Sequence, residues 1–131
     1  MSPTRTAGRR RKRRLVLVVE DDPYMRAAMR RLLETMGHVV VAIGSVSEAV
    51  AAHQRLVPDL AIIDVCIGTA DGEALGELLR QRQPELPILY VSGKAGGPTL
   101  GPRERFLAKP FSGHDLEAML RALLDANGGS A

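Results

Sequence analysis

Short, mostly apolar runs alternate along the chain with longer segments in which apolar residues recur every three or four positions. Each run ends at polar or turn-forming residues, which is typical of strands buried on both faces of a sheet. The runs cover residues 15–19, 39–42, 60–63, 88–91 and 105–108. Strands that alternate with helices in this way predict an α/β fold, with a parallel sheet and helices on both of its faces.

Start and stop signals mark the ends of the longer segments. Asp22 is a favoured N-cap, Pro23 fits the first helical turn, and Gly37 is a natural stop after the last turn. Ser45 and Glu48 have the spacing of a capping box. The expected helices cover residues 23–36, 46–56, 72–83 and 113–126.

The segment between Ser92 and Lys109 interrupts this alternation. It contains five helix breakers, namely Gly96, Gly97, Pro98, Gly101 and Pro102. Helix interiors do not tolerate this density of Gly and Pro. We therefore expect the helix between the fourth and fifth strands to be absent or reduced to a turn.

Polar residues follow four of the five predicted strands. Glu20 and Asp21 follow the first strand, Asp64 the third, Ser92 the fourth and Lys109 the fifth. The carboxyl ends of parallel strands share one edge of the sheet, where open α/β folds place their ligands. We expect these five side chains to converge there.

Such a cluster has a defined chemistry. Three carboxylates repel one another unless a cation shares the site, and all-oxygen ligands favour Mg²⁺ or Mn²⁺. A lysine and a hydroxyl group on the opposite side suit anionic oxygens. A carboxylate can also act as a nucleophile toward phosphorus. Asp22 and Asp71, by contrast, are interpreted as helix caps.

The net charge of +3 is unevenly distributed along the 131 residues. The first fourteen residues, MSPTRTAGRRRKRR, contain seven Arg or Lys and no acid, so their removal leaves a net charge of −4 for residues 15–131. We expect a disordered basic arm over residues 1–14, one folded domain over residues 15–126 and a tail over residues 127–131.

Two interpretations of the basic arm remain open. The charges in residues 5–14 could bind nucleic acid or an acidic membrane face. The arm has no interleaved aromatic residues for base stacking, and the alternative is a solvated tail. The apolar run at residues 15–19 is too short for a signal peptide or a transmembrane segment, and one cysteine excludes an intrachain disulfide. These features predict a cytoplasmic protein.

In order and spacing, the motifs resemble those of a response-regulator receiver domain (CheY-like) of bacterial two-component signalling. The resemblance covers about residues 15–126. It is carried by Val18-Val19-Glu20-Asp21-Asp22, Ile63-Asp64, Asp71-Gly72, Val91-Ser92-Gly93 and Leu107-Ala108-Lys109-Pro110-Phe111. It implies a flavodoxin-like, doubly wound sheet of five parallel strands in the order 2-1-3-4-5.

The resemblance also implies roles for particular residues. Asp64 would be the phosphoacceptor. Asp21 would bind Mg²⁺ directly and Glu20 through water, and the main-chain carbonyl of Cys66 would be another ligand.

The remaining implied roles concern the response to phosphorylation. Ser92 and Lys109 would contact the phosphoryl group, and Phe106 would be an aromatic switch. Lys109-Pro110 would be a cis peptide. One departure lies in the loop after Asp64, where the family usually has a proline in place of Gly68.

The resemblance implies a stand-alone receiver that takes a phosphoryl group from a histidine kinase or phosphotransfer protein and signals to an unknown downstream protein. It would not be an enzyme beyond Mg²⁺-dependent self-phosphorylation and dephosphorylation. The alternatives are a phosphate sink in a phosphorelay and an interaction module independent of phosphorylation. A phosphohydrolase of the haloacid dehalogenase type is disfavoured, because Cys66 stands where such enzymes have a second Asp.

Overall fold

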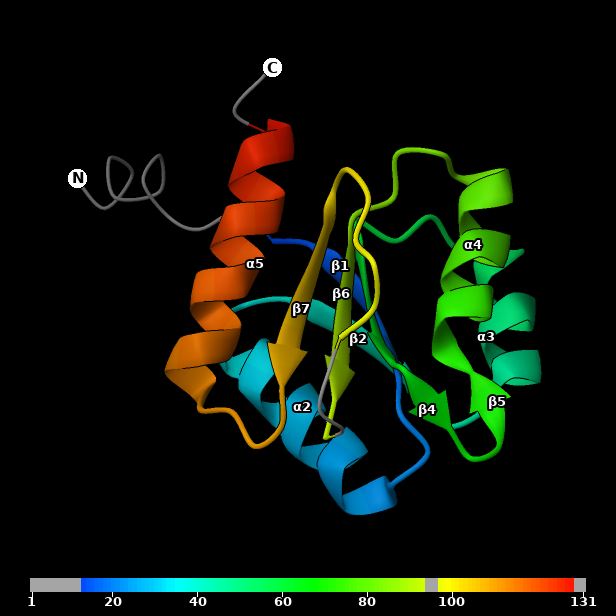
Figure 1. The fold of residues 1–131 in the computed structure, drawn as a ribbon. Coiled ribbons are helices and arrows are strands. Elements are labelled where there is room, and N and C mark those ends of the chain that lie inside the picture. Colours follow the sequence, from blue (N-terminus) through cyan, green and yellow to red (C-terminus); the bar gives the residue numbers. More distant parts are fainter. Residues whose placement is uncertain (1–12, 94–96, 129–131) are drawn as a thin grey trace.

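A five-stranded sheet lies between two layers of helices in the computed structural model, which describes residues 13–93 and 97–128 (Figure 1). Its strands are parallel and run in the order β2-β1-β3-β6-β7. Their bounds are Leu15–Val19 for β1, Val39–Ile43 for β2, Leu60–Asp64 for β3, Ile88–Ser92 for β6 and Glu104–Ala108 for β7. The predicted doubly wound fold and its strand order are confirmed.

Helices cover both faces of the sheet, as Figure 1 shows. Helices α2 (Pro23–Thr35) and α5 (Gly113–Gly128) lie on one face, and α3 (Val46–His53) and α4 (Gly72–Arg82) lie on the other. The helix α5 extends past the boundary predicted at residue 126. Most of the predicted basic arm and the last three residues of the predicted tail lie outside the described residues.

Side chains of the central strand β1 enter two apolar cores, because successive residues of a strand point to opposite faces. Val16 and Val18 pack into the cluster that contains buried residues of α2 and α5. Leu17 and Val19 pack into the cluster that contains buried residues of α3 and α4. Because both of its faces are buried, the sheet is held in place between the helices. This also fixes the position of the edge at which its strands end.

All three predicted helix caps are present, and the Asp71 carboxylate accepts a hydrogen bond from the Glu73 N–H at 2.9 Å. The Asp22 carboxylate accepts a hydrogen bond from the Tyr24 N–H at 3.1 Å, and the Ser45 hydroxyl accepts one from the Glu48 N–H at 3.2 Å. Gly37 has a φ of 96° just after α2, a conformation that favours glycine. The helix that Ser45 begins ends at His53, earlier than the expected residue 56.

No helix occurs among the described residues 97–103 that connect β6 and β7, which confirms the expected loss of the helix there. The chain runs instead as a loop beside β7, shown in yellow in Figure 1. Arg80 of α4 holds this loop, since its guanidinium donates to the carbonyl oxygens of Pro102 and Arg103 at 3.0 and 3.1 Å. It also forms an ion pair with Glu104 at 3.5 Å.

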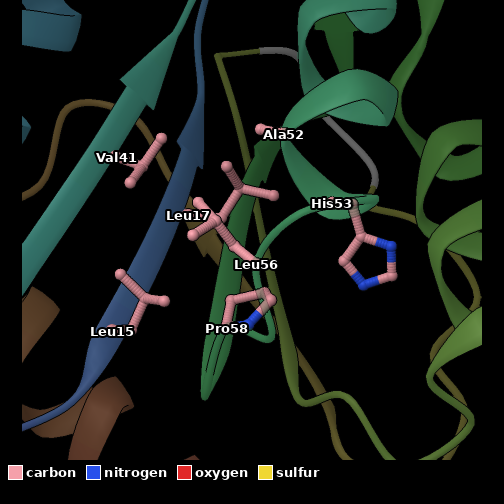
Figure 2. Close-up of a pocket in the computed structure, with 7 residues that line it drawn as sticks. All are labelled: Leu15, Leu17, Val41, Ala52, His53, Leu56 and Pro58. Atoms are coloured by element: carbon pink, nitrogen blue, oxygen red, sulfur yellow. The ribbon is translucent and has the colours of Figure 1, made fainter.

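Two of the three histidines are buried. His38 and His53 are each only 5% exposed. The Nε2 of His53 lies 2.8 Å from Gln83 Oε1, while its buried Nδ1 has no hydrogen-bond partner among the residues that the structure describes. Figure 2 shows His53 beside a small pocket whose other lining residues are apolar or proline. Isolated histidines gave no sequence signal for this burial.

Candidate functional site

Acidic side chains from the ends of β1 and β3 meet at one edge of the sheet. Carboxylate oxygens of Glu20, Asp21 and Asp64 lie within 4.8 Å of one another. Glu20 and Asp64 are buried and Asp21 is exposed. The predicted convergence of these acids is therefore observed, and the site opens to solvent on the side of Asp21.

Lys109 brings a positive charge to this edge from the end of β7. Its Nζ donates to Glu20 Oε1 and to Asp64 Oδ2, each at 2.8 Å. Burial acts to lower the pKa of Lys109, but the two hydrogen bonds and the two negative charges outweigh it and hold the pKa above its usual value. The ammonium group therefore stays charged between two buried carboxylates.

Asp64 is held from its other side by the chain that follows it. The Cys66 N–H donates to Asp64 Oδ1 at 2.9 Å. The chain then turns back through a short antiparallel pair, β4 (Cys66–Ile67) and β5 (Ala70–Asp71), into α4. Gly72 is needed at this return, because a Cβ there would lie 2.0 Å from the main-chain oxygen of Asp64.

Glu20 occupies the most enclosed position of the three acids. Its Oε2 accepts a hydrogen bond from the Asp22 N–H at 3.2 Å, and its Oε1 accepts the one from Lys109. Burial nevertheless raises the pKa of Glu20, and the negative charge of Asp64 raises it further. A second cation at this edge would therefore favour the ionised form of Glu20.

Asp21 is fixed by main-chain groups. Its Oδ2 accepts a hydrogen bond from the Gly68 N–H at 2.9 Å. The guanidinium of Arg26 donates to the main-chain oxygen of Glu20 at 2.8 Å and lies 3.4 Å from that of Asp21. These contacts could not be predicted from the residues alone, because they depend on the three-dimensional path of the loops.

The remaining predicted site residues lie on β6, β7 and the turn that follows. Ser92 is buried at the end of β6, and its main-chain oxygen accepts a hydrogen bond from the Lys109 N–H at 2.9 Å. Phe106 is half-buried on β7 opposite Tyr90, and a Cβ at Gly97 would lie 3.0–3.1 Å from its ring. The Lys109-Pro110 peptide bond is cis.

The donor set fits a divalent cation. Among the described residues, three carboxylates face a single ammonium group, so these four groups carry an excess of two negative charges when all are ionised. All the side-chain donors are hard oxygen ligands, which Mg²⁺ and Mn²⁺ prefer. Glu20, Asp21 and Asp64 are the residues that could hold such an ion.

Comparison with known families places this site in context. The model of the response regulator receiver domain matches residues 16–121. The probable transcriptional regulatory protein TcrX of Mycobacterium tuberculosis is 33% identical over 119 residues, which are 86% of this chain and 50% of that protein. The two-component response regulator PhoP of Pseudomonas aeruginosa is 33% identical over 120 residues, 87% of this chain and 53% of that protein.

Solved structures show the same fold. A CheY-like receiver domain protein from Methanospirillum hungatei superposes with a TM-score of 0.81 at 21% identity, covering 92% of this chain and 100% of that one. The receiver domain of the hybrid histidine kinase CckA gives a TM-score of 0.74 at 27% identity, covering 84% and 98%.

The chain belongs to the response regulator receiver domain family of two-component systems. It spans about half the length of the curated relatives named above. Within the described residues, none of the helices is both long and apolar enough to cross a membrane.

Proposed function

We propose that Asp64 accepts a phosphoryl group from a histidine kinase or histidine phosphotransfer protein. The supporting observation is the position of Asp64, whose Oδ2 lies 2.8 Å from the Lys109 ammonium in a cluster with two further acids. We propose Mg²⁺, or Mn²⁺, as the cofactor, with Glu20, Asp21, Asp64 and the main-chain carbonyl of Cys66 as its ligands. The bound ion would neutralise negative charge on the transferring group.

The transfer exchanges one bond to phosphorus for another. An Asp64 oxygen attacks phosphorus, the P–N bond to the donor imidazole breaks, and an acyl phosphate forms while the imidazole leaves with the electron pair. In such transfers the protein acts mainly by positioning and charge stabilisation. Cys66 N–H holds the Asp64 carboxylate in place, and Lys109 stays next to the oxygens that carry the new negative charge.

The response to phosphorylation would begin at Ser92 and reach Phe106. The Ser92 side chain would contact the phosphoryl oxygens, and its main chain is bonded to the Lys109 N–H. Phe106 lies on β7, which leads to Lys109, and its ring lies against the loop that contains Gly97. A shift at Ser92 would bias the position of this ring and loop, which would form the surface read by a downstream protein.

As a stand-alone receiver, the domain over residues 15–126 would pass its signal to a separate protein. Chemistry at Asp64 would be limited to Mg²⁺-dependent self-phosphorylation and dephosphorylation. In a phosphorelay, the same chemistry would make the chain a phosphate sink.

Intact-mass spectrometry tests the proposed phosphoacceptor. The wild-type protein is incubated with Mg²⁺ and a small phosphodonor, alongside Asp64→Asn and a wild-type sample with EDTA. We expect one added phosphoryl group in the wild-type protein with Mg²⁺ and none in the other two samples. Equal addition to Asp64→Asn would contradict the assignment. No addition with any donor, including a phosphorylated phosphotransfer protein, would favour an interaction module independent of phosphorylation.

A further inference from the structure

The turn between β4 and β5 contacts the acidic cluster directly. This two-residue turn consists of Gly68 and Thr69, and it lies beside the loop that follows β1 (Figure 1). The Gly68 N–H donates to Asp21 Oδ2 at 2.9 Å. We propose that this main-chain N–H is a positioning group that holds Asp21 ready for a divalent cation. The inference rests on the proposed function, because it assumes that Asp21 binds the metal.

The backbone at Gly68 is shaped for this contact. Gly68 has a φ of 62°, whereas Thr69 has no positive φ. This is the pattern of a type II′ turn, which places glycine first and matches the twist of a hairpin. The turn aims the Gly68 N–H out of the hairpin and toward a residue 47 positions earlier in the chain.

Asp21 has a particular need for such a partner. It is exposed, unlike Glu20 and Asp64, so water competes for its oxygens and its side chain has rotamers available. A hydrogen bond to Oδ2 favours one rotamer of the Asp21 side chain and does not use Oδ1. Main-chain donors of this kind orient metal ligands, and their loss typically costs about 10–100-fold in metal affinity.

Proline, the residue that the resemblance to receiver domains implies at position 68, could not play this part. Proline has no N–H and has a φ near −65°, so both the donor and the turn would be lost. The departure from the family pattern therefore changes how the turn is held. It replaces a rigid residue with a hydrogen bond that ties the turn to Asp21.

A titration with Mn²⁺, followed by the electron paramagnetic resonance of the free ion, measures the affinity without requiring phosphorylation. Gly68→Pro removes the N–H. Gly68→Asn is the matched control, since asparagine tolerates positive φ and keeps the N–H. A Cβ at this position would lie 3.9 Å from Asp21 Oδ2, which is an ordinary contact. Amide correlation spectra of each metal-free variant verify folding.

We expect Gly68→Pro to bind Mn²⁺ about tenfold or more weakly than the wild-type protein, and Gly68→Asn to bind within about twofold of it. Wild-type affinity in Gly68→Pro would overturn the inference, as would an equal loss in both variants, because Gly68→Asn keeps the N–H. A wild-type protein that binds no Mn²⁺ would instead remove the metal from the proposed function.

A metal-free measurement tests the contact itself. Asp21→Asn weakens the acceptor and should move the Gly68 amide proton resonance upfield. Asp22→Asn alters the neighbouring carboxylate, which accepts from Tyr24 and not from Gly68, and should leave that resonance in place. A Gly68 resonance that responds equally to both substitutions would overturn the inference.

Discussion

Lys109 Nζ lies 2.8 Å from Asp64 Oδ2. This contact links the ends of β7 and β3, which are not neighbours in the sheet. The same ammonium group lies 2.8 Å from Glu20 Oε1. One cation therefore serves two buried carboxylates. A phosphoryl group added to Asp64 would remain beside this cation, whereas the pairing between Lys109 and Asp64 would have to change.

Replacing Lys109 should destabilise the metal-free protein. Lys109→Gln leaves two buried carboxylates without their cation, and breaking a buried pair in this way costs about 3 kcal/mol. Added Mg²⁺ should restore part of the loss, because it supplies positive charge to the same cluster. Urea unfolding with EDTA and with Mg²⁺ measures both effects. Arg31→Gln, at an exposed position, removes the same charge and should change stability by less than about 0.5 kcal/mol.

The raised pKa of Glu20 predicts a pH dependence of stability. Since the folded protein holds the Glu20 proton more tightly than the unfolded chain does, the metal-free protein loses stability as pH rises from the ordinary value of 4.5 through the raised pKa. The glutamine in Glu20→Gln cannot ionise, so this variant does not lose stability in this way as the pH rises. We expect the unfolding free energy of Glu20→Gln, relative to the wild-type protein, to increase between pH 4.5 and pH 7.5 in EDTA. A difference that stays constant with pH would contradict this prediction.

Gly97 should matter because of its contact with Phe106. A Cβ at Gly97 would lie 3.0–3.1 Å from the ring, whereas one at Gly101 would lie 3.6 Å from the nearest atom of Glu104. Gly97→Ala should therefore shift the ring resonances of Phe106 and cost about 1 kcal/mol. Gly101→Ala, in the same loop, should do neither. Indistinguishable spectra and stabilities of the two variants would show that the loop does not rest on the ring.

Gly76 of α4 should resist replacement by alanine. In an exposed helix interior this change stabilises by about 1 kcal/mol, but a Cβ here would lie 2.0 Å from the Tyr90 hydroxyl oxygen. We expect Gly76→Ala to destabilise the protein by about 2 kcal/mol. Removing the hydroxyl with Tyr90→Phe should reduce that penalty in the double variant. Additive effects of the two substitutions would contradict this packing.

The fold could be predicted because its signals are local. Apolar runs identified all five strands of the main sheet, and the caps Asp22 and Ser45 located two helix starts. The Gly and Pro residues after Ser92 predicted the loss of a helix that the structure also lacks among residues 97–103. The site acids could be predicted to meet because parallel strands end at one edge.

Contacts that depend on loop paths could not be predicted. The bond from Gly68 to Asp21 joins two turns, and nothing in either segment indicates it. The same holds for the buried His53, whose Nε2 lies 2.8 Å from Gln83 Oε1, while the Gln83 side chain also donates to the Pro58 carbonyl at 2.8 Å. An isolated histidine or glycine carries no periodic signal that would place it.

The most direct test of the central proposal locates the phosphoryl group within the chain. Borohydride reduces an acyl phosphate of aspartate to homoserine, which tandem mass spectrometry assigns to a position. After phosphorylation with Mg²⁺ present, we predict homoserine at position 64 and unmodified aspartate at positions 21, 22 and 71. Homoserine at any of those three positions in place of 64 would contradict the account.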